Sequence, residues 1–196
     1  MAISCYILTK KVSFSIMKRM KVIIPVLAAF LLVWSCSELS KLTKFDIPIN
    51  DSVDIPVLPA ALPNGQEFTK NINTNYQSAL SANSVSKDFI DKITLKSFEF
   101  KIIIPDNGDF NFLNSIEISI SSKELPKKII AYKTVSSTDV GKVLMLDIDS
   151  NADLKEYVLA GEIVMHITLS TAKPTSTPYT LATSAVFNVD AKVLGF

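Results

Sequence analysis

The sequence predicts an all-β domain folded as an antiparallel β-sandwich, and three observations support this class. Apolar and polar residues alternate with a period of two through most of the chain after residue 43, as in half-buried strands. About seven to nine such segments are separated by Pro, Asn, Asp and Gly turn residues. Only one short segment has the features of a helix. A small β-barrel is the alternative architecture.

The first two strand segments are predicted to lie at the edge of a sheet. Apolar residues occupy alternate positions in residues 45–49 and again in residues 53–57. Pro48 and Pro56 fall within these segments, and proline has no N–H group to donate to a neighbouring strand. An edge position, where one side of the strand is unpaired, accommodates this loss.

The clearest strand covers residues 93–104. Its apolar residues change from odd to even positions at residues 96–97, which one extra residue in a β-bulge would cause. The even residues expected on the buried face are Phe98, Phe100, Ile102 and Ile104. Residues 105–109 (PDNGD) have turn composition, and an alternating segment follows at 110–120. We therefore expect residues 93–104 and 110–120 to pair as a β-hairpin.

The second half of the chain continues the pattern with one interruption. Weaker strand signals occur at 129–135 and 143–148, and clear alternation returns in two further segments, 163–169 and 179–193. Residues 152–160 combine good helix formers with a following glycine, Gly161. Either Asn151 or Asp153 is expected to cap this single short helix.

The beginning of the chain carries a targeting signal. Basic residues at positions 18, 19 and 21 precede an apolar run at 22–33, which is too short to cross a membrane as a helix. Val33-Trp34-Ser35-Cys36 then follows. This order resembles a bacterial signal peptide that ends in a lipobox, which implies that residues 1–35 are removed and Cys36 is lipidated. Met17 or Met20 is the expected true start.

The rest of the chain is similar in composition to the small lipoproteins of Bacteroidota-type bacteria, which are Lys-, Asn- and Ile-rich β-sandwich domains behind a Ser-Cys lipobox. The resemblance implies attachment to the outer membrane through the lipid on Cys36, on either the periplasmic or the surface side. Residues 36–43 would be the lipidated cysteine and its tether. Residues 44–196 would form a single β-sandwich domain, a length that supports one core.

The composition after Cys36 limits the possible partners. Five of the 20 basic residues precede Cys36 and all 19 acidic residues follow it, so 15 lysines remain and the formal charge is −4. Arg19 is the only arginine, and arginine is the usual bidentate reader of phosphate and guanine. We expect no nucleic-acid partner. Cys5 is the only other cysteine, so no disulfide is expected in the domain.

The sequence contains few residues suited to catalysis. His166 is the only histidine, and a Ser-His-Asp arrangement around it would be expected to use a G-x-S-x-G elbow, which is missing from the sequence. His166 is instead expected on a half-solvated strand face. The five glycines are isolated, so no phosphate-binding loop is present. We expect no catalytic residues and no cofactor.

One group of oxygen-bearing residues has spacing typical of a calcium loop. Asp147, Asp149, Asn151 and Asp153 resemble the opening half of an EF-hand. The sixth position, however, is Ala152 instead of glycine, and the twelfth is Val158 instead of a bidentate glutamate. A strand face followed by a helix cap explains the same residues. The prediction is therefore that no metal binds here.

These observations favour a lipid-anchored envelope lipoprotein that acts as a non-catalytic binding or assembly module. Its partner would be an envelope protein or glycan that the sequence does not identify. Two alternatives remain open: a carrier of an apolar small ligand, and a hydrolase that uses two carboxylates. A large apolar cavity would indicate the carrier, a carboxylate pair in a cleft would indicate the hydrolase, and a closed core with an exposed apolar patch would indicate the binding module.

Overall fold

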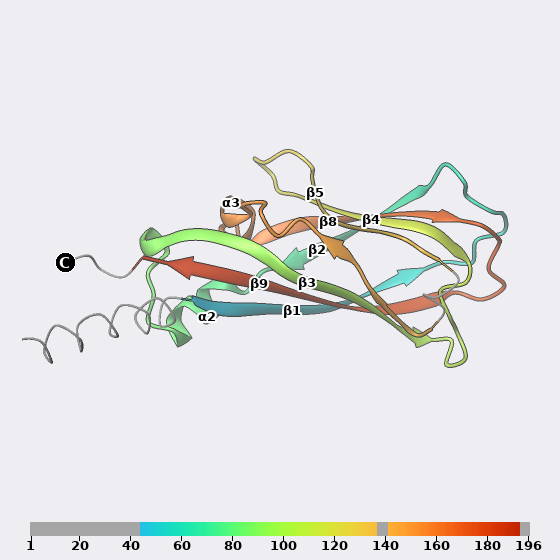
Figure 1. Cartoon of the computed structure of the whole chain (residues 1–196), viewed down its shortest axis with the longest axis horizontal. Coiled ribbons are helices and arrows are strands. Elements are labelled where there is room, and N and C mark those ends of the chain that lie inside the picture. Colours follow the sequence, from blue (N-terminus) through green and yellow to red (C-terminus); the bar gives the residue numbers. More distant parts are fainter. Residues whose placement is uncertain (1–43, 137–140, 193–196) are drawn as a thin grey trace, which may run out of the picture. The chain divides into compact units, whose positions relative to one another are not determined.

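The computed structural model describes residues 44–136 and 141–192, which contain nine β-strands, two α-helices and one 3₁₀ turn (Figure 1). The strands are β1 (Lys44–Ile55), β2 (Gln66–Asn73), β3 (Ile90–Ile104), β4 (Leu113–Ser121), β5 (Lys128–Thr134), β6 (Val143–Met145), β7 (Asp147–Ile148), β8 (Glu162–Thr171) and β9 (Tyr179–Ala191). The helices are α2 (Tyr76–Ala82) and α3 (Lys155–Leu159), and the 3₁₀ turn is η1 (Lys87–Phe89).

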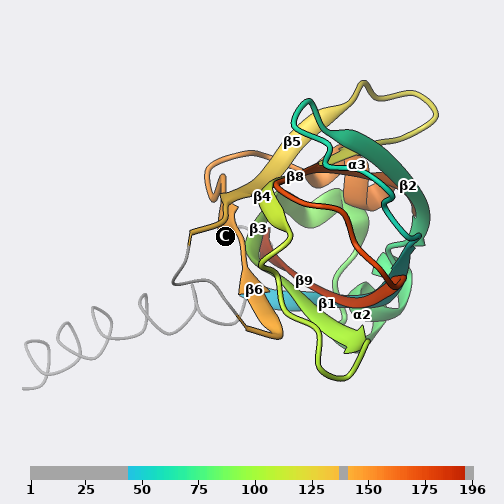
Figure 2. The same cartoon turned by 90° about the vertical axis from the view of Figure 1, so that its right-hand side faces the viewer.

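The strands form two antiparallel sheets packed face to face. Sheet A has the order β1-β9-β3-β6, and sheet B has the order β2-β8-β4-β5-β7. In Figure 2, which looks along the strands, β1 and β9 lie below the core and β4 and β8 lie above it. Each sheet ends in two edge strands, so the architecture is the predicted sandwich and not a closed barrel.

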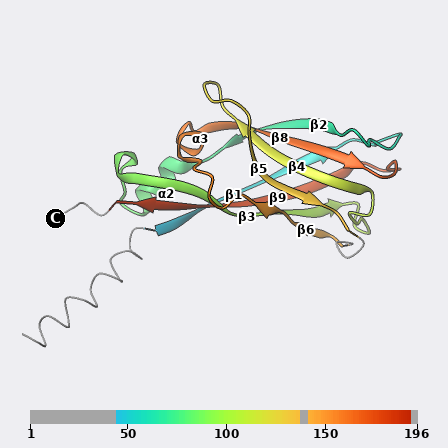
Figure 3. The ribbon, with the colours of Figure 1, turned by 45° about the horizontal axis from the view of Figure 1, so that its top comes forward.

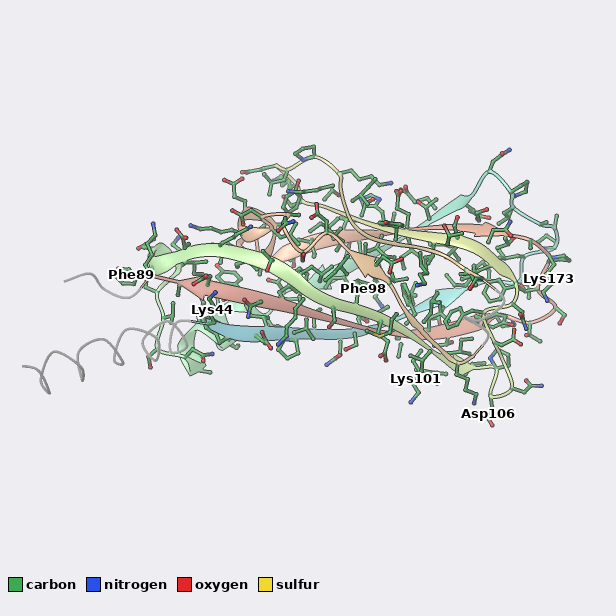
Figure 4. All side chains as sticks on the ribbon, in the orientation of Figure 1. Lys44, Phe89, Phe98, Lys101, Asp106 and Lys173 are labelled. Atoms are coloured by element: carbon green, nitrogen blue, oxygen red, sulfur yellow. The ribbon has the colours of Figure 1, made fainter. Side chains whose placement is uncertain are left out.

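The core lies between the sheets and is closed. Alternate residues of β9 are buried from Leu181 to Ala191, and Phe98 points into the space between the sheets (Figure 4). The void next to Phe98 and Phe187 has a volume of about 20 Å³, which is close to that of one water molecule. Pockets for small organic ligands are typically about 300 to 1,000 Å³. This void is therefore far too small for the apolar ligand that a carrier would hold.

The predicted edge position of the first segments is confirmed. Both segments belong to one continuous strand, β1, which pairs only with β9 in sheet A. Pro48 lies opposite Val186 in this pairing, and β1 has no strand of its sheet on its other side. The polar residues 50–52 contain no strand breaker, so the pairing continues through them. Pro56 lies just beyond the strand.

The strand predicted at 93–104 and its bulge are also confirmed. β3 pairs with β9, and the register shifts by one residue between Leu95 and Ser97. Phe98, Phe100 and Ile102 are buried as expected. The prediction for Ile104 was wrong, because a second register shift between Ile102 and Ile104 turns its side chain outward, where it is 52% exposed.

The predicted hairpin between residues 93–104 and 110–120 was wrong. β3 belongs to sheet A and β4 to sheet B, so residues 105–112 cross from one sheet to the other. Phe110 and Phe112 of this connection are buried in the core. Their side chains fill the end of the space between the sheets, which a hairpin within one sheet would leave open. Alternation shows which side chains face inward, but it does not show which sheet a strand joins.

The segment predicted as one strand at 143–148 is divided between the two sheets. β6 pairs with β3 in sheet A, whereas β7 pairs with β5 in sheet B. The buried Leu146 separates them. The chain therefore closes one side of the sandwich here, and β6 lies along the lower margin of the ribbon in Figure 3.

The single short helix predicted at 152–160 is present as α3, but a second helix, α2, was not predicted. α3 is shorter than the predicted 152–160, and its N-cap is Leu154 instead of Asn151 or Asp153. Asp153 lies one residue earlier, and its Oδ1 accepts a hydrogen bond from the Lys155 N–H at 3.0 Å. The cap prediction was therefore wrong by one residue, because the backbone turn begins before the helix.

Besides the short 3₁₀ turn η1, two elements have no counterpart in the sequence prediction. β2 is mostly polar, with Ile72 as its only buried residue, because it lies at the edge of sheet B. α2 has only Leu80 buried and follows Asn75, whose φ of 50° lies in the left-handed region. Neither element shows a strong hydrophobic period, which explains why alternation did not indicate them.

Candidate functional site

The predicted lipidation site lies outside the described residues. This applies to Cys36, to the expected signal peptide at 1–35 and to the tether at 36–43. Lipidation therefore stays a prediction. Within residues 44–136 and 141–192, no helix has the length and apolar character needed to cross a membrane.

The four candidate calcium ligands extend along a bend between β7 and α3. Asp147 is 3.7 Å from the Lys133 ammonium, and the Asp149 carboxylate accepts the Asn151 N–H at 3.0 Å. The Asp153 carboxylate is occupied by the Lys155 N–H, as described above. Each carboxylate thus has a local partner that is not a metal ion.

Lysine side chains also donate hydrogen bonds to backbone carbonyl oxygens of this bend. The Lys92 ammonium donates to the Asn151 carbonyl at 2.9 Å, and the Lys128 ammonium donates to the Asp153 carbonyl at 3.0 Å. Two cations at these oxygens disfavour a further divalent cation through like-charge repulsion. Among the described residues, no three His, Cys, Asp or Glu side chains converge in a way that could hold a metal.

His166 lies on the outer face of sheet B, as predicted, but it has two polar partners that the sequence did not reveal. It belongs to the inner strand β8, where residues 163, 165, 167 and 169 face the core and His166 faces away. Its side chain is only 16% exposed. An outward-facing histidine with so little exposure must be covered by neighbouring side chains.

Those neighbours form a serine–histidine–glutamate cluster, which we define as Ser121, His166 and Glu67. The His166 Nε2 atom is 2.8 Å from the Ser121 Oγ atom, and its Nδ1 atom is 2.8 Å from Glu67 Oε1. The three residues come from three adjacent strands, β4, β8 and β2. The second carboxylate oxygen of Glu67 accepts a hydrogen bond from Lys127, in the connection between β4 and β5.

The charge on Glu67 determines the direction of these hydrogen bonds. The hydrogen bond from Lys127 and, next, that from His166 lower the pKa of the Glu67 carboxyl below its ordinary value. An ionised carboxylate only accepts hydrogen bonds, so the proton of neutral His166 is on Nδ1. The lone pair on Nε2 is then directed at the Ser121 hydroxyl, which donates to it.

A further serine lies beside this cluster. Ser119 is directly opposite His166 in the pairing of β4 with β8, and it is buried although its strand position faces outward. Its Oγ atom is the only buried side-chain polar atom without a hydrogen-bond partner in the described part of the chain. A buried hydroxyl without a hydrogen-bond partner lowers the free energy of unfolding by about 1 to 3 kcal/mol.

The cluster could not be found from the sequence because it depends on strand register. Glu67 lies in β2, which was not predicted as a strand, and it is 99 residues from His166. Ser121 directly follows the segment predicted at 110–120, whose expected partner was the strand at 93–104. Only the pairing of β8 with both β2 and β4 brings the three side chains together.

A surface groove begins at the residue after Ser121. It has a volume of about 590 Å³ and lies between the β4–β5 connection and α3. Its walls include Ser122 and Leu125 on one side and Lys155 and Leu159 on the other. The groove is thus open and lined by both apolar and charged groups, and its lining includes Ser122, the chain neighbour of Ser121.

Exposed apolar side chains gather where β6 and β7 close the side of the sandwich. We define the seam patch as the residues Ile103 (50% exposed), Tyr132 (57%), Val143 (47%) and Met145 (51%). Val143 lies opposite Lys101 on β3, so Ile103 is its diagonal neighbour on the same face. Tyr132 on β5 lies opposite Asp147 on β7, and Asp147 follows Met145 by two residues. Ile103, Val143 and Met145 are thus exposed on the β3–β6 pair of sheet A, and Tyr132 is exposed on β5 of sheet B, across the β6–β7 connection.

Three carboxyl groups have a lowered pKa, whereas a carboxyl group that acts as a general acid needs a raised one. Lysine hydrogen bonds lower the pKa of Asp46, through Lys96, and of Asp106, through Lys142, just as Lys127 lowers that of Glu67. Asp106 lies at the solvent-exposed periphery (Figure 4). A glycosidase acid requires a raised pKa, so none of these three carboxyl groups suits that role.

Comparison with known proteins gives only remote structural likenesses. Neither a protein-family profile nor a curated protein sequence matches the chain. Solved structures with a similar arrangement include Desmodium yellow mottle tymovirus (10% identity, TM-score 0.30, 76% of this chain and 91% of that chain). A decameric BFDV capsid protein has 10% identity and a TM-score of 0.40, with coverage of 76% and 99%.

A third likeness is to carbohydrate-binding modules from the beta-sandwich superfamily. The identity is 13% and the TM-score is 0.29, over 76% of this chain and 55% of that chain. At these values, all three likenesses concern the arrangement of strands and carry no information on function.

Proposed function

We propose that this protein is a lipid-anchored lipoprotein of the outer membrane that works as a non-catalytic binding or assembly module. The observation that supports this function is the seam patch on a sandwich whose core is closed. Monomeric soluble domains rarely leave contiguous large apolar patches uncovered, and such patches mark interaction sites. The anchor proposal depends on the lipobox sequence that ends at Cys36.

The composition of the seam patch favours an envelope protein over a glycan as the partner. Ile103, Val143 and Met145 are aliphatic or thioether side chains, which gain free energy when they are removed from water but cannot bind hydroxyl groups. Methionine and tyrosine are also enriched in protein interfaces. Glu99 and Lys101 lie opposite Met145 and Val143 and would form the polar rim.

Site-specific crosslinking in the native membrane tests the binding function. A photoreactive amino acid replaces Met145 in the full-length protein, and a matched control replaces Asn71, which is exposed on β2 at the opposite edge of sheet B. We expect a protease-sensitive crosslinked product at position 145 and a much weaker one at position 71. Val143→Asp should remove the product at position 145. Equal products at both positions, or none at position 145, would contradict the proposal.

A further inference from the structure

We propose that Ser121 is an activated nucleophile that accepts an acyl group from activated esters and becomes an acyl-serine. This goes beyond the proposed binding function and does not depend on it. The observation that carries it is the continuous hydrogen-bonded order from the Ser121 hydroxyl to His166 and from His166 to Glu67, with 2.8 Å at each step. This order of nucleophile, base and orienting carboxylate is the geometry that activates serine in proteins.

Each residue of the cluster is held by an element that fixes its position. His166 is on the inner strand β8, which has β2 on one side and β4 on the other, and its ring is mostly covered. Glu67 is held by two partners at once, His166 and Lys127. Because the carboxylate keeps the His166 proton on Nδ1, the Nε2 lone pair is available to the Ser121 proton.

The acylation step balances without any other reactant. As the Ser121 Oγ atom forms a bond to the ester carbonyl carbon, its proton moves to His166 Nε2. The bond between the carbonyl carbon and the leaving oxygen then breaks, and the proton passes from His166 to that oxygen. The products are an ester of Ser121 and a free alcohol or phenol. Aryl esters are the expected class because a phenolate is a better leaving group than an alkoxide.

A groove whose lining starts at Ser122, the next residue along the chain, is the nearest described space for such a compound. Ser121 is the last residue of β4 and is half-buried, and the groove begins at Ser122. Leu125 and Leu159 supply apolar wall surface for an aryl or acyl group. A volume of about 590 Å³ lies within the usual range for small-molecule sites.

The test uses p-nitrophenyl acetate with the full-length protein in detergent micelles. We expect release of p-nitrophenolate, an intact-mass increase of one acetyl group, and peptide mapping of that group to Ser121. Ser121→Ala should lose the adduct. His166→Gln should slow its formation by about 100-fold or more, since a positioned general base contributes about 10²- to 10⁴-fold. Glu67→Gln should also slow it, because the orienting charge is lost.

Ser115→Ala is the matched control, because Ser115 lies on the same strand but has no place in the cluster. It should acquire the acetyl group as fast as the unaltered protein. Circular dichroism and thermal melting of each variant establish that the fold is intact. An adduct on another residue, an adduct that persists in Ser121→Ala, or no adduct on the folded protein would overturn the proposal.

The result is separable from the test of the binding function. Val143→Asp should abolish crosslinking at position 145 and leave acetylation of Ser121 unchanged. Ser121→Ala should do the reverse. The acylation proposal fails on its own if the crosslink forms and the adduct does not.

Discussion

The Phe100→Ala substitution should destabilise the domain more than any surface change. Phe100 is fully buried in the central strand β3, and its ring centroid is 5.2 Å from that of Phe98 with the ring planes at 57°. Replacing a buried phenylalanine by alanine costs about 3 to 5 kcal/mol, which combines lost transfer free energy with the cavity that remains. Loss of the aromatic pair, worth about 0.5 to 1.5 kcal/mol, favours the upper half of that range.

Urea denaturation of the chain from Ser37 to Phe196, followed by circular dichroism, measures this free energy of unfolding. The matched control is Phe89→Ala, because Phe89 is 36% exposed in the 3₁₀ turn before β3. We expect the control to lose clearly less stability, about 1 to 2 kcal/mol, since much of its surface already contacts water. A loss below about 1 kcal/mol for Phe100→Ala, or equal losses at both positions, would refute the assigned inward face of β3.

Four further results are expected. Cys36→Ala in the full-length chain should lose incorporation of a labelled fatty acid, and label that persists would exclude Cys36 as the anchor. Millimolar calcium should leave the melting temperature of the protein almost unchanged. A real calcium site would raise the melting temperature by an amount set by the calcium concentration divided by Kd. A rise that disappears in Asp149→Ala would contradict this prediction. Lys96→Gln should cost under about 1 kcal/mol at neutral pH, as for an exposed ion pair. The hydrogen bonds from Lys96 and Asn188 lower the pKa of Asp46 in the folded state. The stability that Asp46 contributes should therefore be complete above its ordinary pKa and be lost as the pH falls through its lowered, folded-state pKa. Urea melts of the Lys96→Gln variant and the unaltered protein at several pH values measure this, and a difference that stays constant with pH would show the assignment to be wrong.

The sequence predicted most of the inward-facing residues correctly because burial on one face imposes a period of two. Residues of β3, β8 and β9 follow that period, and even the bulge before Ser97 is visible as a change of parity. The prediction failed at Ile104, where a second bulge changes parity again after only a few residues. Too few residues follow that bulge to show a new alternating pattern.

The choice of sheet could not be predicted from the same pattern. A hairpin and a crossing between sheets both place the apolar side chains of residues 110–120 toward the core. What distinguishes them is that Phe110 and Phe112 are buried before β4 begins at Leu113. The alternation from 110 onward extended the predicted strand over this connection and thereby concealed the crossing.

The candidate cluster was missed for a related physical reason. Ser121, His166 and Glu67 are polar residues on an outer face, where no hydrophobic pattern constrains their positions. Their proximity follows from the order β2-β8-β4 in sheet B, which depends on contacts between residues far apart in the chain. The calcium candidates, in contrast, were visible because they are local in sequence, yet locality alone does not make their oxygens converge.

The geometry of β6 indicates how a partner would contact the seam patch. The Leu146 N–H donates a hydrogen bond to β3, and the Lys142 carbonyl accepts one from β3. The backbone N–H and C=O groups of the alternate residues Val143 and Met145 therefore point away from β3. This free edge is only three residues long before the chain crosses to sheet B. Short edge strands resist the addition of a further strand, because few backbone hydrogen bonds are gained. The seam patch should therefore bind through its apolar side chains, which is why a single charge at Val143 is expected to abolish the contact.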